Sequence, residues 1–67
     1  MFTEQDNNIV WNLDKNGVLH LHVDTKQDIG LSGSKKNLLI ASSRGNQSLV
    51  LDDGRSISIG INIYTKP

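Results

Sequence analysis

The sequence predicts an all-β domain, a small five-stranded antiparallel barrel or curled sandwich that spans residues 1–67. Apolar and polar residues alternate in several short stretches, which is the period of a strand with one buried face. Clusters of Gly, Asn, Asp and Ser separate these stretches and mark turns. No window combines apolar spacings of three and four residues with a helix cap. We therefore predict two hairpins joined by a central strand, and no helix.

The first predicted hairpin is NIVWNLDKNGVLHLHV, residues 8–23. A two-residue turn would mix apolar and polar side chains on each face, because a shift of one residue moves every side chain to the other face. A three-residue loop over residues 15–17 instead places Leu13 opposite Leu19. We predict this register, with Gly17 in the left-handed conformation that glycine adopts at little cost.

The second predicted hairpin is SLVLDDGRSISI, residues 48–59. A loop over residues 52–54 pairs Leu49 with Ile57 and keeps the apolar side chains on one face. A two-residue turn would pair Val50 with Ile57 instead. The pattern favours the three-residue loop.

The central strand is predicted in KNLLIASS, residues 36–43, whose consecutive apolar residues are typical of a strand covered on both faces. Between it and the first hairpin, residues 24–37 form a segment rich in Gly, Ser and Lys. We expect an irregular loop there, of a length that is usually functional or mobile.

The last predicted strand is RSISIGINIY, residues 55–64, with isoleucine at every second position. Its ten residues extend over about 33 Å, which is longer than a usual strand. The strand must therefore bend across two sheets or overhang onto a partner. Gly60 lies near its middle, where a glycine marks a bulge, a barrel corner or room for another backbone. We favour the corner and predict that Ile59 and Ile61 are buried.

The composition indicates a thin aliphatic core and a chain that associates with itself. Hydrophobic residues make up 36% and aromatic residues 4% of the sequence, and cysteine is absent. A scaffold this small usually needs a disulfide, a metal or an oligomer interface. We therefore predict a homodimer or higher oligomer.

The charge balance excludes several function classes. Seven basic and seven acidic residues cancel, so no overall field attracts a polyanion and a dedicated duplex-DNA binder is not expected. The first residues, MFTEQDNN, lack an apolar region, and no apolar run reaches the roughly 18 residues of a membrane helix. We expect a cytoplasmic protein with no membrane partner.

No motif indicates catalysis, a metal or a cofactor. His20, His22 and Asp24 share one predicted strand face, and two imidazoles at this spacing can reach one metal ion. Their predicted neighbours across the hairpin are asparagine and valine, so we expect exposed histidines and no metal site. The loop GLSGSKKN, residues 30–37, lacks the Gly-Lys-Ser/Thr order and the following helix of a P-loop. No nucleophile elbow is present, and we predict that the chain is not an enzyme and needs no cofactor.

The lysines and arginines lie in predicted turns, loops and strand ends, as ordinary solubility requires. Alternatively, the four that flank the central strand and the long loop form a basic patch for single-stranded nucleic acid, as in other small β-barrels. Trp11 points inward in the predicted register, which leaves Tyr64, and in second place Phe2, for base stacking. The candidate nucleic-acid-binding residues are Lys26, Lys35, Lys36, Arg44 and Tyr64.

The stretches LLIASSRGNQ and DGRSISIGINIYTK carry a resemblance to a protein family. They resemble small uncharacterised prokaryotic proteins in which an I-A-S-x-x-G-N block precedes a glycine turn and a G-[IL]-N-[IV]-Y-x-K ending. The resemblance implies a shared fold and no mechanism, and it suggests that residues 44–46 and the Tyr64 end form a common feature. The matching positions are Ile40, Ala41, Ser42, Gly45, Asn46, Gly60, Asn62, Tyr64 and Lys66.

Two functional hypotheses follow from the sequence. The first is a small binding module for single-stranded nucleic acid that uses the loop cations. The second is a self-associating structural or protein-interaction module that uses the neutral face of the last strand. A basic patch would favour the first, and a flat Ser, Gly and Asn face at a two-fold contact would favour the second.

Overall fold

The structure, a computed structural model, describes residues 1–31 and 36–66, and this part of the chain contains β-strands and no helix. The strands form three small antiparallel sheets, none of which closes into a barrel. The predicted all-β fold is confirmed, whereas the five-stranded barrel is not. The seven strands are β1 (Val10–Leu13), β2 (Leu19–His22), β3 (Gly30–Leu31), β4 (Leu38–Ser42), β5 (Gln47–Val50), β6 (Ser56–Ile59) and β7 (Asn62–Thr65).

Both hairpins have the predicted registers. Strands β1 and β2 pair with Leu13 opposite Leu19, and β5 and β6 pair with Leu49 opposite Ile57. The glycine that ends each three-residue loop has a positive φ, 81° in the first hairpin and 88° in the second. Only glycine adopts this conformation without steric cost, which explains why the turn chemistry predicts the register.

The central strand is also confirmed, because β4 lies between β3 and β7 in the three-stranded sheet. Strand β3 was not predicted. It places Gly30 opposite Leu39 within the segment expected to be an irregular loop. The register of β4 against β7 shifts between Leu39 and Ala41, which is the position of a β-bulge.

The predicted long strand runs from one sheet into another. Strand β6 pairs with β5, β7 pairs with β4, and Gly60 and Ile61 separate the two strands. A Cβ atom on Gly60 would lie 2.8 Å from the side-chain oxygen of Asn46, so glycine leaves room for this side chain at the crossing. No described sheet closes into a barrel, so the barrel corner predicted at Gly60 is not confirmed.

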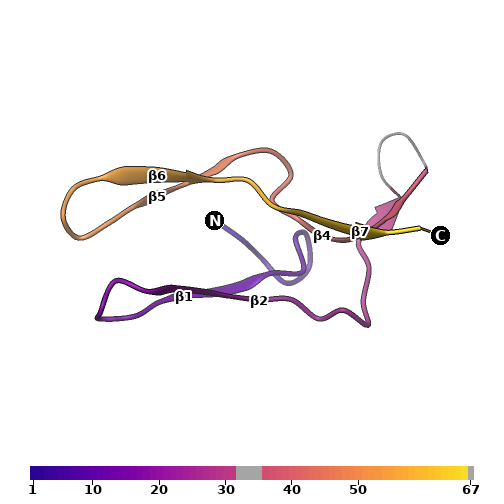
Figure 1. Cartoon of the computed structure of the whole chain (residues 1–67), viewed down its shortest axis with the longest axis horizontal. Helices are drawn as coiled ribbons and strands as arrows, with labels where there is room; N and C mark the ends of the chain where they lie inside the picture. Colours follow the sequence, from indigo (N-terminus) through magenta and orange to yellow (C-terminus); the bar gives the residue numbers. More distant parts are fainter. Residues whose placement is uncertain (32–35, 67) are drawn as a thin grey trace.

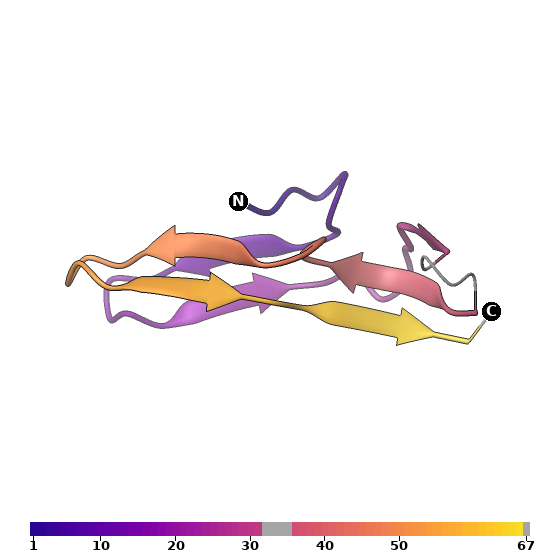
Figure 2. The ribbon, with the colours of Figure 1, turned by 90° about the horizontal axis from the view of Figure 1, so that it is seen from above.

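The molecule is elongated and open. Strands β4 and β5 run along one long side of a ribbon and β6 and β7 along the other (Figure 2), and the β1–β2 hairpin forms a second layer facing β5 and β6 (Figure 1). The extents are 41 × 20 × 16 Å and the radius of gyration is 13.2 Å, against about 11 Å for a compact domain of this length. The accessible surface is 4929 Å², compared with about 4,200 Å² for a typical folded monomer of this mass.

The core is small and centres on the N-terminal segment. Among the described hydrophobic residues, Phe2, Ile9 and Ala41 are buried, with exposed fractions of 6%, 1% and 0%. Ile59 and Ile61, predicted to be buried, are only half-buried and pack at the rim of this cluster. Phe2 fills the core and is not available to stack on a base. The partly buried residues packed on the cluster are Trp11, Val23, Ile59 and Ile61.

Two buried asparagines connect the N-terminal segment to β4. The side-chain nitrogen of Asn7 donates to the backbone oxygen of Ser42 at 2.7 Å. The side-chain nitrogen of Asn8 donates to the backbone oxygens of Asp24 and Ile40, both at 2.9 Å. Asn8 has a φ of 54°, a left-handed conformation that asparagine tolerates better than most residues. These bonds satisfy backbone oxygens where β2, β4 and the N-terminal segment meet.

Candidate interaction surfaces

Within residues 1–31 and 36–66, the segment 56–65 has a free edge along its whole length. Strand β7 is the last strand of the three-stranded sheet, and β6 is one of only two strands in its sheet. Each therefore has a single partner within the described chain, on the side of β4 and β5 (Figure 2). We call the opposite side of residues 56–65 the β6–β7 edge.

The direction of the backbone groups shows which residues this edge presents. The Leu51 nitrogen donates to the Arg55 oxygen at 2.8 Å, and the Ser43 nitrogen donates to the Ile61 oxygen at 2.9 Å. Residues 55 and 61 thus both direct their carbonyls toward β4 and β5. Because successive residues of a strand direct these groups to opposite sides, the even-numbered residues direct theirs to the free side. The outward groups belong to Ser56, Ser58, Gly60, Asn62 and Tyr64.

The β6–β7 edge also lacks two of the features that usually prevent edge pairing, charge and proline. Natural edge strands carry lysine, proline, bulges or inward charges that deter a second chain. Residues 56–65 contain no charge and no proline, and the nearest cations, Arg55 and Lys66, stand at the two ends. The edge is therefore a ready template for another strand.

Two serines at the end of β4 hydrogen-bond to the chain where β6 passes into β7. The Ser42 hydroxyl donates to the side-chain oxygen of Asn62 at 2.9 Å. The Ile61 nitrogen donates to the Ser43 hydroxyl at 3.0 Å, which satisfies the backbone where strand pairing is interrupted. The serine block thus contacts Ile61 and Asn62, whereas Tyr64 lies further along, opposite Leu39.

The described cations predicted to bind nucleic acid lie at separate places in the fold. Lys36 precedes β4 and Arg44 follows it, so about 26 Å of extended chain separates them. The Arg44 guanidinium donates through Nε to the backbone oxygen of Asp6 at 2.7 Å, which ties it to the N-terminal segment. Lys26 is exposed in the turn after β2. Lys35 lies outside the described residues.

The remaining candidate, Tyr64, is exposed near two cations. Its exposed fraction is 60%. Because Thr65 pairs with Leu38, the neighbouring Lys66 and Lys36 lie at the same end of the sheet. Tyr64 thus lies at the same end of the sheet as Lys36, and Arg44 follows the other end of β4.

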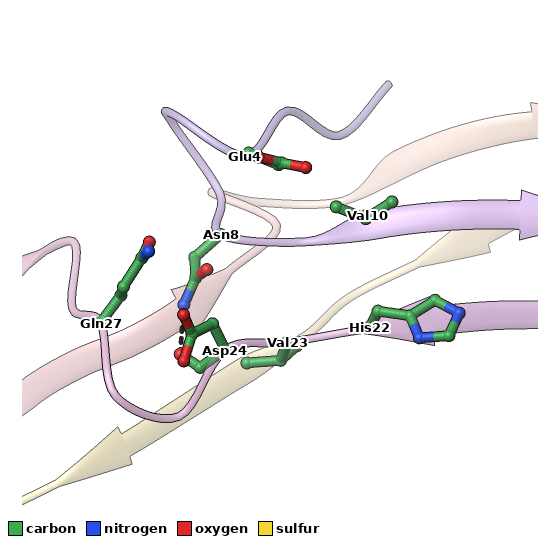
Figure 3. A pocket seen from close by; sticks show the side chains of 7 residues that line it. All are labelled: Glu4, Asn8, Val10, His22, Val23, Asp24 and Gln27. Atoms are coloured by element: carbon green, nitrogen blue, oxygen red, sulfur yellow. Dashed lines mark hydrogen bonds between the residues drawn. The ribbon is translucent and has the colours of Figure 1, made fainter.

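A pocket of about 330 Å³ opens between the N-terminal segment and the end of β2 (Figure 3). The Asn8 side chain lies at its base, where it is occupied by its bond to the Asp24 backbone oxygen. The charged groups in its lining are carboxylates, and neither lysine nor arginine contributes, so the pocket does not suit a phosphate. The lining residues are Glu4, Asn8, Val10, His22, Val23, Asp24 and Gln27.

The histidines do not form a metal centre in the described part of the chain. His20 Nε2 lies 2.8 Å from Asp14 Oδ2, across the turn of the first hairpin. The hydrogen bond with His20, followed by that from the Val18 nitrogen, lowers the pKa of Asp14 below its ordinary value. Within residues 1–31 and 36–66, no three His, Cys, Asp or Glu side chains are grouped closely enough to hold a metal ion.

Comparison with known proteins finds no matching family model, no curated relative and no similar solved structure. The described residues also include no helix with the length and apolar character of a membrane span. Geometry is therefore the basis of the functional argument. Sequence reasoning found the last strand but missed the buried Asn7 and Asn8, because an Asn-Asn pair near a chain end has the signature of an exposed turn.

Proposed function

We propose that this chain is a non-enzymatic protein-interaction module that binds an extended segment by adding it as a strand to the β6–β7 edge. The observation that carries the proposal is the edge itself. It has ten uncharged residues whose outer side pairs with no other described strand. In this mode of recognition, main-chain hydrogen bonds provide affinity and alternate side chains provide specificity. The even-numbered residues would supply the donors and acceptors.

A synthetic peptide with the sequence of residues 55–66 tests this proposal. Methylation of the odd-numbered amide nitrogens blocks one side of the peptide and leaves the even-numbered side free to pair. We expect this peptide to protect the amides of Ser58, Gly60 and Asn62 from hydrogen exchange at a concentration where the chain is monomeric. The matched peptide, methylated on the even-numbered nitrogens, should leave them unprotected.

Two lysine variants provide the control within the chain. Ser58 and Ser48 lie opposite each other on the same exposed face, but only Ser58 lies on the β6–β7 edge. We expect Ser58→Lys to abolish peptide binding and Ser48→Lys to preserve it, because a lysine on an edge strand deters pairing. Equal binding by the two variants, or equal binding of the two peptides, contradicts the proposal.

We propose a second candidate function, weak binding of single-stranded nucleic acid. It is supported by the exposure of Tyr64 at the end of the sheet that also carries Lys36 and Lys66. Exposed aromatic rings stack on bases with little sequence preference, and nearby cations neutralise phosphates. With two or three cations the salt dependence is shallow, about 0.7 in logarithmic slope for each phosphate contact.

Titration with a mixed-sequence DNA oligonucleotide at low salt tests the second candidate. We expect the amide resonances of Lys36 and Tyr64 to shift, and Tyr64→Ala to weaken binding at least about fivefold because a stacking contact is lost. Tyr64→Phe, which keeps the ring, should bind like the original chain. Unshifted resonances, or equal losses in both variants, remove this function.

A further inference from the structure

We infer that the partner of the β6–β7 edge is a second copy of this chain, paired antiparallel about a two-fold axis at Gly60. The inference rests on the proposed function and adds the identity and register of the partner. In this register residue 56 of one copy lies opposite residue 64 of the other, and Gly60 lies opposite Gly60 of the second copy. The two β6–β7 segments would form the centre of one continuous sheet.

The direction of pairing follows from the two faces of the strand. Ile57, Ile59 and Ile61 are half-buried on the face toward the core, and Ser58 and Gly60 between them are exposed. Two copies that join through the same edge, with their isoleucine faces on the same side, are related by an axis perpendicular to the sheet. Such an axis reverses the strand, so the pairing is antiparallel.

The isoleucine pattern selects the register. The register between the two copies can change only in steps of two residues, because a step of one would place isoleucines of one copy beside polar residues of the other. With the axis at Gly60, Ile57 lies opposite Ile63 and Ile59 lies opposite Ile61, so all four isoleucines face isoleucine. An axis at Ile59 would place Ile63 opposite Arg55. An axis at Ile61 would place Ile57 opposite Thr65. The central register therefore gives the most complete apolar contact.

The charges at the two ends agree with the antiparallel arrangement. The turn that precedes β6 contains Asp52 and Asp53, and Arg55 forms an ion pair with Asp53 at 2.7 Å, which leaves one net negative charge. The far end of β7 carries Lys66. With the axis at Gly60, Lys66 of one copy lies opposite Gly54 of the second copy, beside its acidic turn.

The exposed surface of the single chain is large for its mass and includes apolar side chains of the β6–β7 edge. The accessible area of 4929 Å² exceeds the roughly 4,200 Å² of a typical monomer of this mass. Ile63 and Tyr64, both on the β6–β7 edge, have exposed fractions of 38% and 60%. A second copy paired along β7 would cover the part of Ile63 that is still exposed.

Disulfide formation between single-cysteine variants tests the register, since the natural chain has no cysteine. We expect a mixture of Ser56→Cys and Tyr64→Cys to oxidise to a mixed dimer, because residues directly opposite in such a pair lie about 5.5 Å apart. Each variant alone should remain uncrosslinked, with its two sulfurs about 27 Å apart. A mixture of Ser58→Cys and Tyr64→Cys, which is out of register by two residues, should crosslink much more slowly.

Sedimentation of the full chain at tens of micromolar separates the possible failures. The expected result is twice the chain mass, falling to the chain mass for Ser58→Lys and unchanged for Ser48→Lys. A monomer that still binds the odd-methylated peptide overturns the second copy as partner and leaves the proposed function standing. A monomer that binds neither peptide overturns both. A dimer in which the out-of-register mixture crosslinks faster overturns the register.

Discussion

Replacement of Ile59 by aspartate is expected to leave the chain unfolded at 25 °C. Ile59 packs against the cluster of Phe2, Ile9 and Ala41, and a carboxylate there would lack an ionic partner. Placing an unpaired charge in an apolar site costs several kcal/mol. A chain of 67 residues has a total stability of only about 3–10 kcal/mol. Circular dichroism with urea titration measures the loss.

The neighbouring residue provides the matched control. Ser58 is exposed on the opposite face of β6, so Ser58→Asp should change the free energy of unfolding of the monomer by less than about 0.5 kcal/mol. The same substitution adds a charge to the β6–β7 edge, and it should weaken self-association while the fold persists. The reverse result, with Ser58→Asp unfolded and Ile59→Asp folded, contradicts the assignment of the two faces.

Replacement of Asn8 by aspartate is expected to cause the second largest loss of stability, although the two side chains have nearly the same shape. The Asn8 nitrogen donates to the backbone oxygens of Asp24 and Ile40. A carboxylate would instead direct an acceptor at these two oxygens. Each buried group left without a partner costs about 1–3 kcal/mol, so we expect a loss of at least about 3 kcal/mol at neutral pH. Urea midpoints of the two chains give the difference.

The effect of Asn8→Asp should depend on pH in a defined direction. The protonated acid can donate one of the two hydrogen bonds, so the folded state raises the pKa of the new carboxyl above its ordinary value of about 3.9. The loss of stability relative to the original chain is therefore smallest at a pH below the pKa that the new carboxyl has in the unfolded chain. The loss grows as the pH rises through the pKa of this carboxyl in the folded chain. Asn16→Asp, in the exposed turn of the first hairpin, should show neither the loss nor this dependence. Equal stability of Asn8→Asp and the original chain at neutral pH contradicts the role of Asn8.

The sequence by itself determined the local structure of this protein. The registers of both hairpins follow from three-residue loops that end in glycine at positive φ, because the turn sets the pairing and the alternation sets the face. The central position of β4 follows from its continuous apolar run. The passage of residues 55–64 from one sheet to another is one of the two outcomes expected of a strand too long for one sheet. Each of these features depends on residues close together in the chain.

The tertiary structure alone decided which distant residues meet. Phe2 and Ile9 occupy the core centre, and Ile59 and Ile61 lie at its rim, because the N-terminal segment folds back onto β4. Asn7 is buried only because it meets the Ser42 oxygen, 35 residues away in the sequence. Arg44 is directed to the Asp6 oxygen, away from Lys36, because β4 is extended and separates its own two ends. Alternation and turn chemistry report on neighbouring residues, whereas these contacts depend on how separate sheets pack, which no local pattern encodes.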